Sequence, residues 1–277
     1  MNLRSLHAIA AASALVLTLG ACGSDSGDPG ASSGGAAGAD LDLVTDGSLT
    51  VCSDVPYAPF EDFDEGSDLG YKGFDVDITN AIAKGLGLKL VYKDSSFDGL
   101  QSGLALNAGQ CDIAASAMTI TEDRKKNIAF SDGYYDSKQS LLVGKDSGIK
   151  AIGDLSGKKV GVQQGTTGKT YAEENAKGAK LVSFPSDAEM WQALQAGQVD
   201  ALLQDLPVNV PHTESGDFTI VEEYSTDEQY GLAMKKGNDA LVKAVNEQLK
   251  AIRDNGDYDK FYNTYFTEGG DDAAATS

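Results

Sequence analysis

The sequence has few of the residues that build metal centres and nucleophilic active sites. It contains only two histidines, His7 and His212, and three cysteines among 277 residues. Metal sites of the common kinds need clusters of such ligands, so we expect no metal and no other cofactor. A Ser-His or Cys-His pair is also not evident, which argues against a hydrolase of the triad type.

Positive charge is scarce as well. Lysine and arginine number 22 against 42 aspartates and glutamates, which gives a formal net charge of −20. Nucleic acids and anionic lipids attract basic proteins, so this balance disfavours both as partners. An acidic surface attracts cationic solutes, although a solvated acidic face explains the charge equally well.

The chain begins with a segment that does not resemble part of a folded domain. Arg4 precedes an apolar run, residues 8–19, that is too short and too rich in alanine for a comfortable membrane span. The run closes with LGAC, residues 19–22, which resembles a bacterial lipobox. We expect residues 1–21 to be a lipoprotein signal peptide and Cys22 to carry the lipid that anchors the mature protein outside the cytoplasmic membrane. A plain secretory signal with an incidental cysteine is the alternative.

Two further segments lack the apolar side chains that a core needs. Residues 22–40 are almost entirely Gly, Ser, Ala and Asp, and residues 269–277 are small and polar. We expect a flexible linker and a disordered tail, respectively. With Cys22 assigned to lipid, Cys52 and Cys111 remain, and an oxidising compartment favours a disulfide between them. Two buried free thiols are the alternative.

The rest of the chain alternates strand and helix patterns in two successive halves. This alternation predicts an α/β fold with parallel sheets. Two extended segments, residues 139–143 and 230–234, are expected to cross between the halves and form a two-strand hinge. We therefore expect one lobe from residues 41–141 and 234–268 and a second from residues 142–233. The expected strands are residues 49–53, 88–92, 159–162, 180–183 and 199–204; the expected helices are residues 76–85, 97–108, 168–175, 187–196, 238–253 and 258–266.

The two halves share a helix-glycine-strand motif. LNAGQCDIAA, residues 106–115, aligns without a gap with LQAGQVDALL, residues 194–203. The alignment makes Ala117 and Asp205 equivalent, and both follow the ends of predicted strands, where ligands bind in open α/β sheets. Independent use of the same helix-ending residues is the alternative.

The segment from Cys111 to Lys126 carries the first candidate binding residues. We expect a strand at residues 112–116 and then a helix capped by Thr121, with Arg124 at the end of its first turn. The Thr119 hydroxyl and the Arg124 guanidinium could together hold a carboxylate or a phosphate. A solvated surface arginine is the alternative reading.

The loops after the first strand of each half have complementary chemistry. One loop offers the Asp54 carboxylate and the Tyr57 ring, while the other offers Gln163 and the hydroxyls of Thr166 and Thr167. Complementary polar rims suggest a cleft between two lobes. The second loop is not a phosphate-binding P-loop, because Gln163 stands where that pattern requires its first glycine.

At this point the motifs resemble a known family. Residues 49–266 are similar to the polar amino-acid-binding proteins of bacterial ABC importers, the family 3 extracellular solute-binding proteins that include histidine-, lysine/arginine/ornithine- and glutamine-binding members. The resemblance implies a bilobal, type II periplasmic-binding-protein-like fold. The motifs that carry it are VPYAPFE (55–61), GFDVD (73–77), FDGL (97–100), MTITEDRKK (118–126), FSDGYY (130–135), GVQQGTT (161–167) and residues 200–207.

The resemblance also implies a role for individual residues. Arg124 would take the α-carboxylate of a free amino acid, helped by Thr119 and by the backbone near Ala117 and Thr167. Asp205 would take the α-ammonium group. The ligand side chain would meet Asp54, Tyr57, Phe97 and Gln163. Two aromatic faces and a carboxylate suit a cation, so arginine, lysine, ornithine or histidine is favoured, with glutamine next and glutamate disfavoured by Asp54.

The implied mechanism is hinge closure around the ligand without chemistry, followed by delivery to an ABC permease. We expect a monomer that is not an enzyme. The alternative is a cyclohexadienyl dehydratase-like enzyme on the same fold, in which Asp54 or Asp205 would protonate a leaving group. A sensory input module is a third reading, disfavoured by the lack of a membrane span or signalling domain in the sequence after residue 40.

Overall fold

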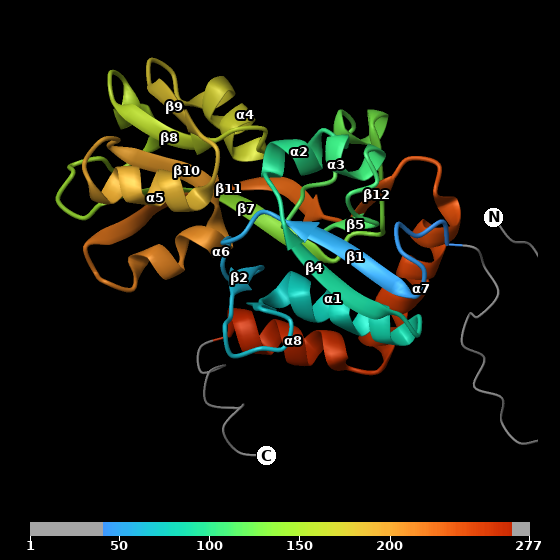
Figure 1. Ribbon diagram of the computed structural model, residues 1–277. Coiled ribbons are helices and arrows are strands. Elements are labelled where there is room, and N and C mark those ends of the chain that lie inside the picture. Colours follow the sequence, from blue (N-terminus) through green and yellow to red (C-terminus); the bar gives the residue numbers. More distant parts are fainter. Residues whose placement is uncertain (1–40, 268–277) are drawn as a thin grey trace, which may run out of the picture. The chain divides into compact units, whose positions relative to one another are not determined.

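The structure is a computed structural model that describes residues 41–267 (Figure 1). The predicted signal peptide, Cys22 with its expected lipid, the expected linker and the expected tail at residues 269–277 lie outside the described residues. Within them, no helix combines the length and the apolar character that a membrane crossing requires.

The first lobe is built on a five-stranded sheet in the order β4-β1-β5-β12-β6. Strand β1 pairs in parallel with β4 and β5, whereas β12 runs antiparallel to β5 and β6. The strands are β1 (Ser48–Ser53), β4 (Lys89–Asp94), β5 (Ile113–Ala114), β6 (Ile128–Phe130) and β12 (Ala233–Lys235). The helices of this lobe are α1 (Phe74–Gly85), α2 (Phe97–Gln101), α3 (Leu104–Asn107), α7 (Asp239–Asp254) and α8 (Asp257–Phe266), and a small hairpin joins β2 (Asp62–Phe63) to β3 (Tyr71–Lys72).

The second lobe is built on a sheet in the order β11-β7-β10-β8-β9. Strand β8 pairs in parallel with β9 and β10, and β7 runs antiparallel to β10 and β11. The strands are β7 (Tyr135–Gly144), β8 (Lys159–Gln163), β9 (Lys180–Phe184), β10 (Ala201–Asp205) and β11 (Phe218–Tyr230). The helices are α4 (Thr167–Asn175), α5 (Asp187–Gln195) and α6 (Leu206–Asn209). The two sheets therefore have the same topology, which confirms the bilobal α/β fold.

The repeated motif has the same structural role in both lobes. Gly109 and Gly197 both adopt a φ of 66°, and each ends a helix just before the third parallel strand. The aspartates that follow then clamp the first strand: Asp112 N–H donates to Thr50 O at 2.8 Å, and Asp200 N–H donates to Lys159 O at 2.8 Å. Each carboxylate accepts the N–H of that same partner residue, at 2.7 Å in both cases. The aspartate of the motif thus sets the register at the start of each strand.

Cys52 and Cys111 form a disulfide with a Cα–Cα distance of 5.8 Å. Cys52 lies on β1, and Cys111 lies just before β5, which pairs with β1. The bond links the two central strands of the first sheet, and both cysteines are buried in the core between the sheet and helices α2 and α3.

Most predicted elements occur within a residue or two, but four expectations differ from the structure. The helix expected at residues 97–108 is two helices separated at Gly103, which has a φ of 79°. The helix expected after Thr121 is wrong: only a 3-10 turn, Arg124–Lys126, precedes β6. The Thr121 hydroxyl still accepts the Arg124 N–H at 3.2 Å, but the chain must turn at once into the sheet.

The remaining differences concern the passages between lobes. Strand β11 was not predicted: only its last residue, Tyr230, falls in the crossing expected at residues 230–234. Its mixture of charged and apolar residues does not alternate cleanly. Residues 139–143 lie inside β7 and pair with both β10 and β11. Residues 131–134 and 231–232 join the two sheets along the chain, but Tyr134 and Leu232 are buried in the core of the first lobe. The chain therefore passes between the lobes along the paired strands β7 and β11.

Gly73 fixes the loop that carries Tyr57 against helix α1. It adopts a φ of 135°, and a Cβ atom there would lie 2.1 Å from the Phe60 carbonyl oxygen. The N–H groups of Phe74 and Asp75 donate to the carbonyls of Pro59 and Phe60, both at 3.0 Å. Figure 1 shows α1 beside α8 under the same sheet. The close approach of Gly73 to the Phe60 carbonyl leaves no room for a side chain at residue 73.

We therefore expect Gly73→Ala to lower the free energy of unfolding by about 2–4 kcal/mol, because it adds a backbone clash to an unfavourable φ. Gly87→Ala is the matched control, since Gly87 has a φ of 70° and a Cβ atom there would have no neighbour within 4 Å. That control should lose only about 1 kcal/mol. Urea unfolding of both variants measures the difference, and equal losses would contradict the clash.

Candidate functional site

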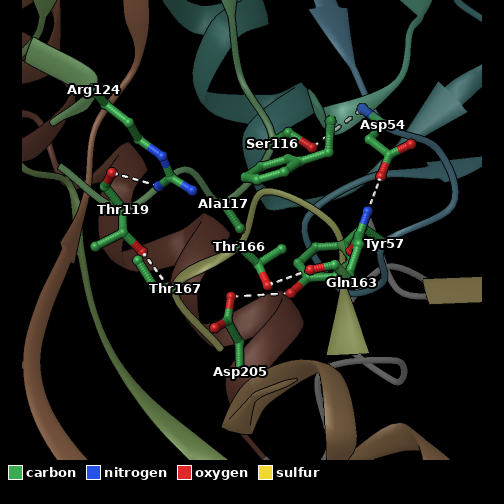
Figure 2. Close-up of a pocket in the computed structure, with 11 residues that line it drawn as sticks. Asp54, Tyr57, Ser116, Ala117, Thr119, Arg124, Gln163, Thr166, Thr167 and Asp205 are labelled. Atoms are coloured by element: carbon green, nitrogen blue, oxygen red, sulfur yellow. Dashed lines mark hydrogen bonds between the residues drawn. The ribbon is translucent and has the colours of Figure 1, made fainter. Parts of the chain in front are cut away.

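A cavity between the lobes gathers every residue predicted to bind ligand (Figure 2). The volume left inside it is about 10 Å³, roughly the room of one water molecule. Ser116 is the one lining residue that was not predicted. The lining residues are Asp54, Tyr57, Phe97, Ser116, Ala117, Thr119 and Arg124 from the first lobe and Gln163, Thr166, Thr167 and Asp205 from the second.

Strand topology explains why these residues meet. Asp54 directly follows β1, and Ser116 follows β5, while Gln163 and Asp205 are the last residues of β8 and β10. The carboxyl ends of parallel strands lie at one edge of each sheet, where α/β proteins bind ligands. Each lobe therefore turns the same edge toward the cavity.

Arg124 forms one end of the site. It is 6% exposed, and its guanidinium lies 5.2 Å from the centroid of the Phe97 ring. Nη1 donates to the Thr119 carbonyl at 2.7 Å, and Nη2 donates to the Gly165 carbonyl in the second lobe at 3.0 Å. Burial lowers the pKa of Arg124 to about 10, so the side chain stays cationic at neutral pH.

Three threonines line the same cavity as this guanidinium: Thr119, Thr166 and Thr167. Thr119 Oγ1 lies 3.4 Å from Thr167 Oγ1, which brings together a hydroxyl from each lobe. Thr166 caps helix α4, because its side chain accepts the Lys169 N–H at 3.1 Å. A cation, two hydroxyls and the first turn of a helix are a suitable environment for a carboxylate.

Asp205 supplies a negative charge to the same cavity from the second lobe. Its carboxylate accepts hydrogen bonds from Tyr57 OH at 3.0 Å, from Tyr230 OH at 2.6 Å and from Gln139 Nε2. Burial raises the pKa of Asp205, while these three donors and the charge of Arg124 oppose the rise. None of the ion pairs within residues 41–267 includes Asp205. A buried, oriented carboxylate without a contacting cation suits an ammonium ligand.

Glu228 lies beside Asp205 and was missed in the sequence. Gln139 Nε2 donates to Glu228 Oε2 at 2.8 Å, so one amide bridges two carboxyl groups. Burial and then the charge of Asp205 raise the pKa of Glu228 to about 7. No sequence signal could have found it, because it lies in a polar stretch of β11 that was not recognised as a strand.

Asp54 lies in the part of the cavity that was assigned to the ligand side chain. Gln163 Nε2 donates to Asp54 Oδ2 at 2.6 Å, and the Asp54 N–H donates to Ser116 Oγ at 3.1 Å. Burial raises the pKa of Asp54 to about 7; the Gln163 bond lowers it, and the charges of Asp94 and Asp187 raise it further. Figure 2 shows Asp54 and Arg124 well apart, with Asp205 facing Tyr57.

Ser116 and Ala117, which follow β5, form the floor of the site, and the contact made by Ala117 differs from the expectation. The backbone near Ala117 was expected to help bind a carboxylate, but the Ala117 N–H donates to Asp75 Oδ2 at 2.9 Å. Ala117 also adopts a φ of 43°, a left-handed conformation that costs an L-residue about 1–2 kcal/mol. The turn after β5 is thus held by a buried acid on α1, a contact that the sequence could not reveal.

Comparison with known proteins decides the family. The model of the bacterial extracellular solute-binding proteins, family 3, matches residues 49–268. The chain belongs to this family. The match confirms the resemblance predicted from the motifs.

Relatives of this family 3 solute-binding protein cover most of its length. The ABC transporter glutamine-binding protein of Bacillus subtilis (strain 168) is 38% identical over 203 residues, which are 71% of this chain and 73% of the relative. An ancestral arginine-binding protein bound to arginine is similar in structure, with a TM-score of 0.74 and 39% identity over 79% of this chain and 98% of its own. An ancestral amino acid-binding protein described as a precursor of cyclohexadienyl dehydratase has a TM-score of 0.72 and 38% identity over 80% of this chain and 96% of its own.

Proposed function

We propose that this solute-binding protein is the extracytoplasmic, lipid-anchored component of an amino-acid ABC importer and binds a free L-amino acid with a cationic side chain. One observation carries the proposal: Arg124 and Asp205, of opposite charge, line the same buried cavity from different lobes. A free α-amino acid carries the complementary pair of charges on adjacent atoms. The names of the relatives support the amino-acid class.

Arg124 and Asp205 bind the α-carboxylate and the α-ammonium group of the ligand. The Arg124 guanidinium, held by two carbonyl groups, presents its remaining donors to the α-carboxylate, and Thr119 and Thr167 supply hydroxyls beside it. Asp205 takes the α-ammonium group, for which its three neutral hydrogen-bond donors fix the carboxylate in place. These contacts select any L-amino acid and leave the side chain to the rest of the cavity.

The side-chain end of the cavity favours a cation. Asp54 is buried, the rings of Tyr57 and Phe97 line the same cavity, and the charges of Asp94 and Asp187 act on Asp54. A cation relieves this concentration of negative charge, which favours arginine, lysine, ornithine or histidine. Glutamine is the second candidate, because its amide can replace the Gln163 amide that now donates to Asp54. Glutamate would be repelled by Asp54.

Ligand entry requires the lobes to separate. Direct hydrogen bonds now join the lobes at Gln163 to Asp54, at Tyr57 to Asp205 and at Arg124 to the Gly165 carbonyl. The cavity that these contacts leave is too small for an amino acid without movement. We infer that the paired strands β7 and β11 form the hinge, near the register shift between Tyr224 and Glu228, and that closure on the ligand creates the state a permease recognises. Membrane attachment through lipid on Cys22 and a monomeric state complete the proposal.

A thermal-shift screen of the twenty amino acids, ornithine and citrulline tests the function. Ligands that bind only the native state raise the melting temperature, so arginine, lysine, ornithine or histidine should give the largest shift. Incubation with prephenate and arogenate tests the enzyme alternative in parallel. Stabilisation by none of the amino acids, or turnover of either cyclohexadienyl substrate, would contradict the proposal.

The preference for arginine over glutamine is expected to rise with pH. The pKa of Asp54 is raised to about 7, so its charge is lost as the pH falls through that value. A cationic side chain needs the ionised form, and its affinity therefore falls by up to about tenfold per pH unit below pH 7. The side chain of glutamine is neutral, so its affinity depends less on the charge of Asp54. Titration calorimetry between pH 5.5 and 8.5 gives the ratio of the two affinities.

Use of the ratio removes the effect of other groups, such as Glu228, that titrate near pH 7 and act on both ligands. In Asp54→Asn the ratio should be low and constant with pH. A ratio that rises equally in wild type and in Asp54→Asn would exclude Asp54 as the source of the selectivity.

A further inference from the structure

Two buried acids lie directly behind the floor of the binding site and have no role in the proposed contacts with ligand. Glu61 closes the turn that carries Tyr57, because the two residues exchange both backbone hydrogen bonds, at 2.7 and 3.3 Å. Asp75 lies in the first turn of α1. Both side chains are 0% exposed. Buried acids of this kind need a structural or functional reason.

The acids are bound to consecutive residues of the floor. Ser116 Oγ donates to Glu61 Oε1, and the Ala117 N–H donates to Asp75 Oδ2 at 2.9 Å. Ser116 Oγ also accepts the Asp54 N–H at 3.1 Å. A continuous path therefore leads from Glu61 through Ser116 to Asp54, the residue proposed to read the ligand side chain.

In the part of the chain that the structure describes, these carboxyl groups form no ion pair with a cation. None of the ion pairs within residues 41–267 includes Glu61 or Asp75. The second oxygen of Glu61, Oε2, is buried without a hydrogen-bond partner among the described residues. The ionisable groups that act on the pair are Asp54 and the phenols of Tyr57, Tyr92 and Tyr134, of which Tyr134 OH donates to Asp75 Oδ1 at 2.7 Å.

We propose that Glu61 and Asp75 form a pair that retains a shared proton and positions the floor of the binding site, Glu61 through Ser116 and Asp75 through Ala117. Two uncompensated carboxylates in a dry interior repel each other, so the pair keeps at least one proton where isolated acids would be ionised. The neutral member acts as a hydrogen-bonding group only. The role rests on the proposed function, because the floor matters only if the cavity binds a ligand.

The pKa values agree in direction with this arrangement. Burial raises the pKa of Glu61 well above its usual range, and the charge of Asp75 adds to the rise. Burial likewise raises the pKa of Asp75 to about 7, against the hydrogen bonds from Ala117 and Tyr134. Because the folded state binds the extra proton, it is favoured at low pH and loses that advantage as the pH rises through these values.

The shared proton is tested without ligand, by denaturant unfolding of wild type and Glu61→Gln between pH 5 and 9.5. Glutamine imitates the protonated acid and cannot ionise. Relative to Glu61→Gln, the unfolding constant of wild type should increase with pH, by up to about tenfold per unit for one retained proton. Parallel curves over this range would overturn the shared proton.

The positioning role is tested by affinity for the amino acid that gives the largest thermal shift. Glu61→Gln should bind within about threefold of wild type, because it keeps the contact with Ser116. Ser116→Ala and Glu61→Leu should each bind at least tenfold more weakly, and their combination no more weakly than Glu61→Leu, since both act along one path. Asp112→Asn is the control: a buried acid of the same lobe that accepts the N–H groups of Val44 and Thr50 and does not line the cavity.

Two outcomes would overturn the positioning role. The first is a loss of affinity in Glu61→Gln as large as in Glu61→Leu, which would make the charge essential. The second is unchanged affinity in Ser116→Ala, a small substitution that should fold even if Glu61→Leu does not. If wild type binds no amino acid, the proposed function and the positioning role both fail, while the unfolding curves still decide whether the proton is shared.

Discussion

Arg124→Ala is expected to weaken amino-acid binding by about 30-fold to several thousandfold. The guanidinium is buried at one end of the cavity, where it is the only cation among the residues that line it. Without it the ligand carboxylate would enter the site desolvated and unpaired, a loss of about 2–5 kcal/mol, which corresponds to roughly 30-fold to several thousandfold in affinity. Titration calorimetry with the amino acid identified by thermal shift measures the loss.

Two further variants separate charge from geometry. Arg124→Lys keeps the positive charge but cannot hold two carbonyls and a carboxylate in one plane, so most of the affinity should still be lost. Arg253→Ala is the matched control, because Arg253 is an exposed arginine of the same lobe that donates to the Gly133 carbonyl away from the cavity. Affinity within a few-fold of wild type in Arg124→Ala would exclude this residue as the carboxylate site.

Asp205→Asn is expected to remove most of the recognition of the α-ammonium group and to weaken binding about 100-fold or more. The two side chains have the same shape, and asparagine still offers an oxygen to the hydroxyls of Tyr57 and Tyr230. Its NH₂ group can donate to Gln139 Oε1, which has no partner among the described residues, once the Gln139 amide has rotated. What changes is the charge that faces the ligand. The sharper measurement compares arginine with 5-guanidinopentanoic acid, which lacks only the α-amino group. Wild type should discriminate strongly between them, and Asp205→Asn should not.

The same substitution should not destabilise the protein without ligand. Burial raises the pKa of Asp205, so ionisation of this carboxyl group costs more free energy in the folded state than in the unfolded chain. Asparagine removes that unfavourable term, and the free energy of unfolding should stay equal or rise while binding falls. Asp200→Asn serves as the control, since its carboxylate accepts the Lys159 N–H at the other end of the same strand. Discrimination that survives in Asp205→Asn would place the ammonium site elsewhere.

The structure adds to the sequence prediction chiefly the residues that hold the lining side chains in place. Asp205 depends on Tyr230 and Gln139, and Gln139 in turn is shared with Glu228. None of these three could be connected with Asp205 from the sequence. Tyr230 and Glu228 lie on β11, whose irregular pattern follows from two register shifts in its pairing with β7. A strand with such shifts does not keep one periodicity, so its residues could not be assigned to faces.

Local features were predicted where local physics determines them. Alternating patterns gave the parallel strands, and Gly109 and Gly197 marked the ends of helices because glycine adopts a left-handed φ at little cost. The failure after Thr121 has the opposite cause: the capping signal is present, but pairing of β6 with β12 ends the helix after one turn. Tertiary pairing outweighed local preference there.

Thr119 and Arg124, the first candidate binding residues found in the sequence, both line the cavity. The sequence by itself determined the fold class, the family and ten of the eleven residues that line the cavity, because these follow from periodicity and from short motifs. Only the tertiary structure decided what surrounds them: Asp75 on the Ala117 N–H, Glu61 on Ser116, and Tyr57 on Asp205, 148 residues away. Such contacts depend on how distant segments pack, and no local pattern encodes that packing.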